Sequence, residues 1–170
     1  MDKNGSKWLK MVKKSCIMWL KIQKGSESML LGEYHHQLDE RNRIRIPAKF
    51  RTELGSNYII MKGTDNCLFV YSSAEMQNLL NEKLKAVPLS DVKAQKSIRM
   101  LFSSGFEVEE DAQGRFVLPQ NLREFANITK DVVSIGVGNR IELWDEGTWG
   151  DYNSNSDFDT ILGDLSQYGV

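Results

Sequence analysis

Cysteine is scarce in this sequence. Only Cys16 and Cys67 occur among the 170 residues, so the chain has neither the paired spacing of a zinc site nor a disulfide framework. A chain without these features is typical of a reducing compartment, and we expect a cytoplasmic protein. No apolar run approaches the roughly 20 residues that a membrane-spanning helix needs, so we expect no membrane span.

Signatures of catalysis are also lacking. The sequence has no phosphate-binding loop, no dinucleotide fingerprint and no serine–histidine–aspartate order. His35 and His36 are adjacent, so a strand would point them to opposite faces, which does not suit two ligands of one metal. We therefore expect a protein that is not an enzyme, with no metal, no cofactor and no small-molecule substrate.

Charge is unevenly distributed along the chain. The net charge of −1 says little about a nucleic-acid partner, but residues 39–51 hold five basic side chains against two acidic ones. No lysine or arginine follows Arg140. The chain is therefore basic early and acidic late, which favours an early segment as the contact for a polyanion.

The basic segment reads as a sharp turn, a short strand and a helix. Arginines and isoleucines alternate in the strand, in the order Arg43, Ile44, Arg45 and Ile46. A strand would turn the isoleucines toward a core and the arginines toward solvent, where nothing obvious neutralises them. Pro47 suits the first turn of the helix that follows.

The same pattern occurs again 72 residues later. The matched pairs at this one offset are Asp39 with Asp111, Arg43 with Arg115, Pro47 with Pro119 and Arg51 with Arg123. Phe116 and Leu118 replace the two isoleucines, so the core-facing side stays apolar. Residues 60–71 also match residues 133–144 once one residue is inserted. The sequence therefore predicts a duplicated unit, and we expect the two copies to pair, because neither could bury its apolar face alone.

Through its two Asp-x-x-x-Arg motifs and the opening at Met29 to Tyr34, the sequence resembles the MraZ family of bacterial transcriptional regulators over about residues 29–149. The resemblance implies an α+β fold of two tandem AbrB-like (swapped-hairpin) units, forming a pseudo-repeated, double-psi-type small barrel with linking helices. It implies sequence-specific binding to short direct repeats of promoter DNA in the cell-division and cell-wall gene cluster. The resemblance also implies a ring-like homo-oligomer, such as an octamer, that represses the chain's own operon. It further implies a nucleoid-associated location.

Four segments are expected. Residues 29–88 form the first unit, which faces DNA, residues 89–149 form the second unit, and residues 150–170 form an acidic tail that is either a terminal helix or partly disordered. Residues 1–28 carry seven lysines. They are expected to be a disordered extension or the product of a start codon assigned too early, and a basic amphipathic helix on nucleic acid or membrane is the alternative.

Local patterns predict the elements within these units. Strands are expected at residues 31–38, 58–61 and 68–71, and helices at residues 47–54, 73–86 and 91–103. Gly55 should end the first helix, and residues 40–42 should be the loop of a hairpin that leads from residues 31–38 into residues 43–46. The two later helices should form a helical hairpin that joins the copies.

Each motif residue has an expected role. Asp39 and Asp111 should hold the two turns, with Asn42 and Gly114 in the left-handed conformation. Candidate contacts to base edges or close phosphates are Arg41 and Arg43, and candidate phosphate contacts are Arg45, Lys49 and Arg51. The second copy keeps Arg115, but Val117 and Asn121 replace Arg45 and Lys49.

An alternative is an assembly or protein-interaction module that does not read DNA directly. Salt discriminates between the two, because DNA binding weakens with a slope near −0.9 per neutralised phosphate in a plot of log affinity against log salt. Assembly through apolar surfaces would hardly respond.

Overall fold

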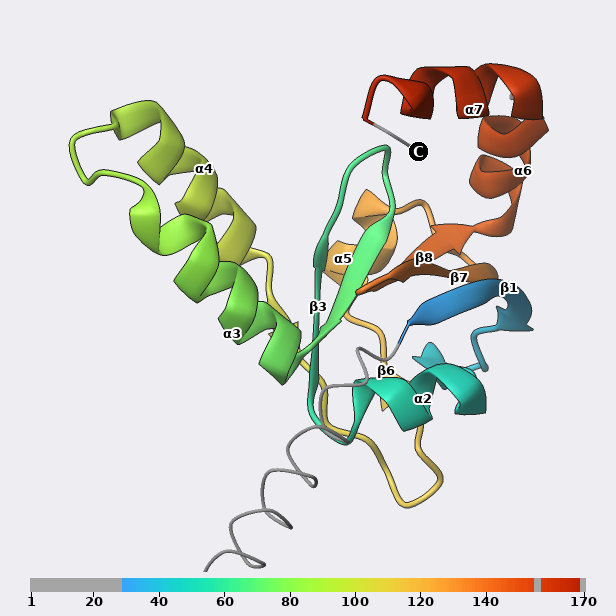
Figure 1. Cartoon of the computed structure of the whole chain (residues 1–170). Coiled ribbons are helices and arrows are strands. Elements are labelled where there is room, and N and C mark those ends of the chain that lie inside the picture. Colours follow the sequence, from blue (N-terminus) through green and yellow to red (C-terminus); the bar gives the residue numbers. More distant parts are fainter. Residues whose placement is uncertain (1–28, 155–156, 169–170) are drawn as a thin grey trace, which may run out of the picture.

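The computed structural model describes residues 29–154 and 157–168 (Figure 1). The expectations for residues 1–28 lie outside this described part. The fold is α+β, as predicted, and consists of a six-stranded antiparallel sheet, a two-stranded ribbon and surrounding helices. The strands of the first half are β1 (Leu30–Gln37), β2 (Arg43–Ile44), β3 (Tyr58–Lys62) and β4 (Leu68–Ser72). Those of the second half are β5 (Phe106–Glu107), β6 (Phe116–Val117), β7 (Asp131–Gly138) and β8 (Ile141–Asp145).

The helices connect and flank these strands. They are α2 (Ala48–Leu54), α3 (Ser73–Glu82), α4 (Val92–Ser103), α5 (Gln120–Phe125), α6 (Glu146–Ser154) and α7 (Phe158–Ser166), with a 3₁₀ turn η1 (Leu84–Ala86) after α3. Proline and glycine set the bounds of α2, since Pro47 has φ −48° and Gly55 has φ +78°. The helix predicted over residues 73–86 instead ends at Glu82 and continues as the 3₁₀ turn.

Strands of the two sequence copies are interleaved in the sheet. The order in the sheet is β1-β7-β8-β4-β3-β5, and β2 pairs with β6 in the separate ribbon. Three of the sheet's pairs, β1–β7, β4–β8 and β3–β5, join one copy to the other. The expectation that the two copies pair is therefore confirmed, and they share a single sheet.

One expectation about the sheet is not confirmed, and another is wrong. The double-psi barrel is not confirmed, because the sheet is unclosed within the described residues, with β1 and β5 at its edges. The two-residue β5 offers too few backbone groups for the eight-residue β1 to pair along its length. The expected hairpin of β1 and β2 does not form a strand ladder, because β1 pairs along its whole length with β7. Only the turn between β1 and β2 is closed by backbone hydrogen bonds.

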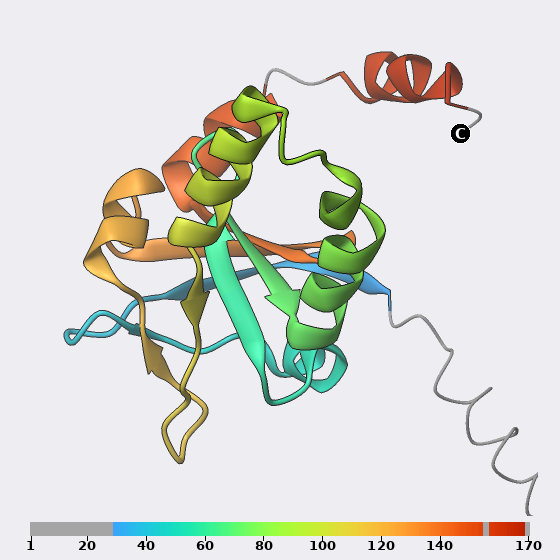
Figure 2. The same ribbon diagram turned by 90° about the vertical axis from the view of Figure 1, so that its left-hand side faces the viewer.

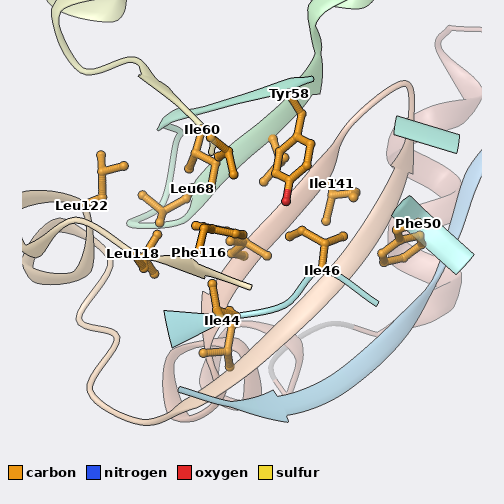
Figure 3. Close-up of a cluster of buried hydrophobic side chains, with 14 of the residues drawn as sticks. Ile44, Ile46, Phe50, Tyr58, Ile60, Leu68, Phe116, Leu118, Leu122 and Ile141 are labelled. Atoms are coloured by element: carbon orange, nitrogen blue, oxygen red, sulfur yellow. The ribbon is translucent and has the colours of Figure 1, made fainter. Parts of the chain in front are cut away.

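The main core lies between the ribbon and the sheet (Figure 3). The alternating residues of the two copies point into it as predicted, with Ile44, Ile46, Phe116 and Leu118 all at most 2% exposed. Phe50 of α2 and Leu122 of α5 occupy matching positions and are also buried. These side chains fix which face of the ribbon is turned away from the core, and that face carries the motif arginines.

Two helical features lie outside the sheet. The hairpin formed by α3, η1 and α4 stands beside the sheet and joins the two copies, as predicted (Figure 2). After β8, α6 and then α7 follow at the acidic end of the chain. No helix among the described residues has the length and apolar character that crossing a membrane requires.

Candidate nucleic-acid interface

The first turn is closed around the carboxylate of Asp39. One oxygen of Asp39, Oδ1, accepts the backbone N–H groups of Arg41 and Arg43, each at 2.9 Å. The other, Oδ2, accepts from Nε and Nη2 of Arg43, each at 2.7 Å. Asn42 takes the left-handed conformation with φ +57°, as predicted. A single side chain thus holds both the loop backbone and the arginine that follows it.

The second turn repeats this geometry. Asp111 Oδ1 accepts the backbone N–H groups of Gln113 at 2.8 Å and Arg115 at 3.0 Å. Asp111 Oδ2 accepts from Nε and Nη2 of Arg115 at 3.0 and 2.9 Å. Gly114 has φ +72° in place of the asparagine. Both Asp-x-x-x-Arg motifs therefore form the same hydrogen-bonded turn.

These contacts keep both aspartates ionised. The side-chain and backbone hydrogen bonds from Arg43 lower the pKa of Asp39 to about 2. The backbone and side-chain hydrogen bonds from Arg115 likewise lower the pKa of Asp111 to about 2. Both carboxylates therefore stay charged around neutral pH, so the turn geometry is constant over that range.

Arg43 lies between two carboxylates. Its side chain is 24% exposed, it is fully paired with Asp39, and its Nη1 lies 3.9 Å from Oδ2 of Asp111. The arginine face was expected to have nothing obvious to neutralise it, but Arg43 is neutralised. Asp39 does so from the same loop, and Asp111 approaches from the turn across the ribbon, which a strand pattern does not reveal. Arg43 is therefore held rigidly, with its position set by both motif turns.

The other candidates on the first copy are more open. Arg41, Arg45 and Lys49 are exposed, and no salt bridge involves them in the described part of the chain. Arg45 donates through Nη2 to the backbone carbonyl of Gln113 in the second turn. These three side chains lie on the first turn, just after β2 and on α2, and they retain donors that can reach a ligand.

Arg51, in contrast, is tied to the second copy. Its Nη2 lies 3.2 Å from Oε2 of Glu110, and its guanidinium covers Gly114 so closely that a Cβ there would lie 2.6 Å from Cζ. The hydroxyl of the buried Tyr58 donates to Oε1 of Glu110 at 2.6 Å. The equivalent Arg123 makes no such contact and donates to the carbonyl of Leu118.

Sequence reasoning did not single out Glu110 or Tyr58. At the repeat offset, Glu110 falls on the buried Leu38, so a carboxylate stands where the other copy is apolar. This difference between the two copies is the feature of the sequence that could have identified Glu110. It marks Glu110 as the acceptor that anchors Arg51 and Tyr58 across the two copies.

The ribbon brings the two turns into one surface. Arg43 pairs with Val117 and Ile44 with Phe116 in antiparallel register, so the two motif turns lie at opposite ends of the same short ladder. A two-stranded ribbon has the width that the major groove of B-DNA admits. The arrangement can therefore present arginine donors to a groove while its apolar side stays in the core.

The histidines lie away from this surface. His35 bonds to Glu33 and Glu146, each at 2.8 Å, and these hydrogen bonds raise its pKa. His36 bonds to Ser134 at 2.6 Å, and burial lowers its pKa to about 4. The described residues contain no group of three or more side chains suited to holding a metal ion.

Comparison with known proteins identifies the family of this architecture. The family model described as "MraZ protein, putative antitoxin-like" matches residues 29–99 and again residues 101–162. The two matches divide the chain near the end of α4, in agreement with the duplication described above. Together they cover more than half of the chain.

Curated relatives extend over nearly the same region. A protein named Transcriptional regulator MraZ from Clostridium tetani is 48% identical over 143 residues, which is 84% of this chain and 100% of the relative. The protein of the same name from Clostridium beijerinckii has the same identity and coverage. That from Syntrophomonas wolfei is 46% identical over 144 residues. The two matched repeats and these full-length relatives show that the chain belongs to the MraZ family.

Proposed function

We propose that this chain is a transcriptional regulator that binds duplex DNA through the first motif turn and the ribbon. The observation that carries the proposal is the exposure of Arg41, Arg45 and Lys49 in the same copy as an Arg43 that Asp39 holds in place. The curated relatives named as transcriptional regulators support it. Each of the three exposed side chains can neutralise a phosphate, and the arginines can also bond a guanine edge with two donors.

Arg43 acts in this proposal both as a contact and as a positioning group. Two of its nitrogens are occupied by Asp39, so at most part of the guanidinium is available to a base edge or a close phosphate. Its pairing holds the loop that carries Arg41. Loss of Arg43 should therefore disorganise the contact surface as well as remove a charge.

The first copy makes most of the DNA contacts. At the position of Arg45, the second copy has Val117, which is 55% exposed, and Asn121 replaces Lys49. Arg115 remains as one further DNA contact of the ribbon, and Arg51 supports the surface from the Glu110 side. The second copy, residues 89–149, mainly serves the fold and assembly, and residues 150–170 form the acidic tail.

The target and the assembly follow from the family resemblance. The chain represses its own operon in the cell-division and cell-wall gene cluster, binds short direct repeats of promoter DNA, and is cytoplasmic and nucleoid-associated. It acts as a ring-like homo-oligomer, such as an octamer. One small ribbon makes few contacts, and a ring that presents many ribbons to repeated sites gains affinity through effective concentration.

The test is a binding titration against the DNA upstream of the chain's own operon at two salt concentrations. The proteins are the wild type, Arg43→Ala and a control, Arg99→Ala, whose side chain is exposed on α4 away from the ribbon. We expect the wild type and the control to bind and Arg43→Ala to fail, with all three at the same oligomeric size. Equal binding by the wild type and Arg43→Ala would overturn the proposal.

An assembly module without DNA readout is the second candidate. Exposed apolar side chains on the helical hairpin favour it, among them Leu89 at 89% and Val92 at 77% exposure. Under this alternative the titration shows no binding even at low salt, while the oligomeric size is insensitive to salt.

A further inference from the structure

Two surfaces of the described chain are apolar, exposed and opposite in charge. One is a groove at the tip of the helical hairpin, of about 500 Å³. The other is the outer face of α7. We infer that α7 of one copy docks into the hairpin groove of a second copy, which deepens the proposed ring assembly and rests on it.

The groove is lined mainly by aliphatic side chains from both arms of the hairpin. Its lining includes Leu80, Leu84, Val87, Leu89, Ile98 and Lys85. None of the residues of α4 is buried within the chain. A helix that exposes an apolar groove in this way lacks the partner that would normally remove this surface from water.

The rim of the groove is basic. Exposed basic side chains lie along the hairpin tip at Lys83, Lys85, Lys93 and Lys96. No salt bridge neutralises them within the described residues. The acidic residues nearby are Glu82 at the end of α3 and Asp91, which is engaged as the N-cap of α4 through the N–H of Ala94. The groove therefore suits an apolar segment that carries negative charge.

α7 has this complementary character. Ile161 and Leu165 lie on one face of the helix with Leu162 beside them, and all three are 38–47% exposed. Asp159 and Asp164 flank this apolar stripe. From residue 141 to residue 170 the chain has seven acidic residues and no basic one. At roughly 1.5 Å per residue the helix is about 14 Å long, which is short enough to lie along α4.

The groove and the helix belong to one chain but do not meet within it. In both views α7 stands apart from α3 and α4 (Figures 1 and 2). Docking between copies then joins two different surfaces head to tail. Contacts of this heterologous kind generate a ring when the rotation between neighbours closes, so the same contact repeats around the assembly.

Charge reversal tests this contact. The hairpin variant carries Lys85→Glu with Lys96→Glu, and the helix variant carries Asp159→Lys with Asp164→Lys. Sedimentation velocity at low salt should show the wild type as an oligomer and each variant shifted toward the 19.5 kDa monomer. An equimolar mixture of the two variants should recover the oligomer, and so should one chain that carries all four changes. Lys130→Glu, which changes an exposed lysine away from both surfaces, should stay oligomeric.

The outcomes separate the inference from the proposed function. If the wild type is oligomeric and either variant keeps its size, or the mixture fails to recover, α7 does not dock in the groove although the assembly stands. If the wild type is a monomer, the docking and the ring are both wrong. The DNA titration then still tests whether the ribbon binds DNA. The hairpin variant could also remain oligomeric and lose binding to anionic phospholipid vesicles. That result would assign the groove to a membrane surface and overturn the inference.

Discussion

The guanidinium of Arg51 in α2 lies against Gly114 in the turn of the other repeat, so a side chain there would have to displace the end of Arg51. The contact is asymmetric, since the matching Arg123 donates to Leu118 and the matching turn has Asn42. The duplicated units have thus diverged into one turn that is covered and one that is open. This asymmetry can be measured.

Gly114→Ala should lower the free energy of unfolding by about 2 kcal/mol. The substitution combines a left-handed alanine with a Cβ that displaces the flexible end of Arg51 from Gly114 and from its ion pair with Glu110. Asn42→Ala is the matched control, because Asn42 has a similar φ in the other repeat, and should cost only about 1 kcal/mol. Urea denaturation measures both values, and equal losses would show that the contact with Arg51 adds nothing.

Asp39→Asn should weaken DNA binding even though it removes a negative charge from a DNA-binding surface. Simple charge counting predicts tighter binding. The hydrogen bonds of Asp39 instead position Arg41 and Arg43, so we expect the dissociation constant to rise about tenfold, the scale of one lost charge-assisted hydrogen bond.

Asp111→Asn provides the comparison for this prediction. It alters the equivalent turn of the copy that carries fewer basic side chains, and it should have the smaller effect on affinity. A fluorescence anisotropy titration gives both constants. Tighter binding by Asp39→Asn would mean that Asp39 acts on DNA only through its charge.

The salt dependence of DNA binding should separate the side chains that touch phosphates from those that support the surface. Arg41→Gln, Arg45→Gln and Lys49→Gln should each reduce the slope of log affinity against log salt by about 0.9 for every phosphate that is no longer neutralised. Arg51→Gln should leave the slope unchanged, because Arg51 is already paired with Glu110. A reduced slope for Arg51→Gln would show that Arg51 neutralises a phosphate, as its place in the basic segment suggested.

Stability should fall as the pH drops from 6.5 to 4, and His36 is the cause. Burial lowers the pKa of His36 from 6.5 to about 4, so in this window the unfolded chain binds a proton that the folded chain does not. The free energy of unfolding should decrease by up to about 3 kcal/mol across the window.

His35 does not produce the same loss. Its pKa is raised by Glu146 and Glu33, so its stabilising contribution is fully present below pH 6.5 and is lost only as the pH rises through its folded pKa. Thermal or urea unfolding at several pH values should therefore show the acid loss in His35→Gln and not in His36→Gln. An unchanged acid loss in His36→Gln would place its origin in another group.

Local sequence signals were sufficient for much of the fold. Pro47 and Gly55 act on their own backbone and so set the bounds of α2 from sequence alone. The alternation through Ile44 and its repeat at Phe116 predicted correctly which side chains enter the core. Asp39 was identified as a turn residue because the groups that donate to its carboxylate lie within four residues of it.

Long-range relationships could not be obtained in this way. β1 was expected to lead into β2 as a hairpin, yet it pairs with β7, about a hundred residues away. Nothing in the composition of Leu30–Gln37 distinguishes β2 from β7 as its partner, because both strands offer backbone hydrogen-bonding groups and apolar neighbours. The approach of Asp111 to Arg43 and the cover of Gly114 by Arg51 depend on another long-range pairing, that of β2 with β6.

The exchange of strands also determines when the chain can fold during synthesis. Leu30 pairs with Gly138 and Gln37 with Asp131, so β1 leaves the ribosome roughly 5 to 20 seconds before β7 at ordinary elongation rates. For that time the first repeat has its turn but lacks the strands that complete its sheet. The nascent chain therefore acquires its native arrangement only near the end of translation, as one cooperative unit and not repeat by repeat.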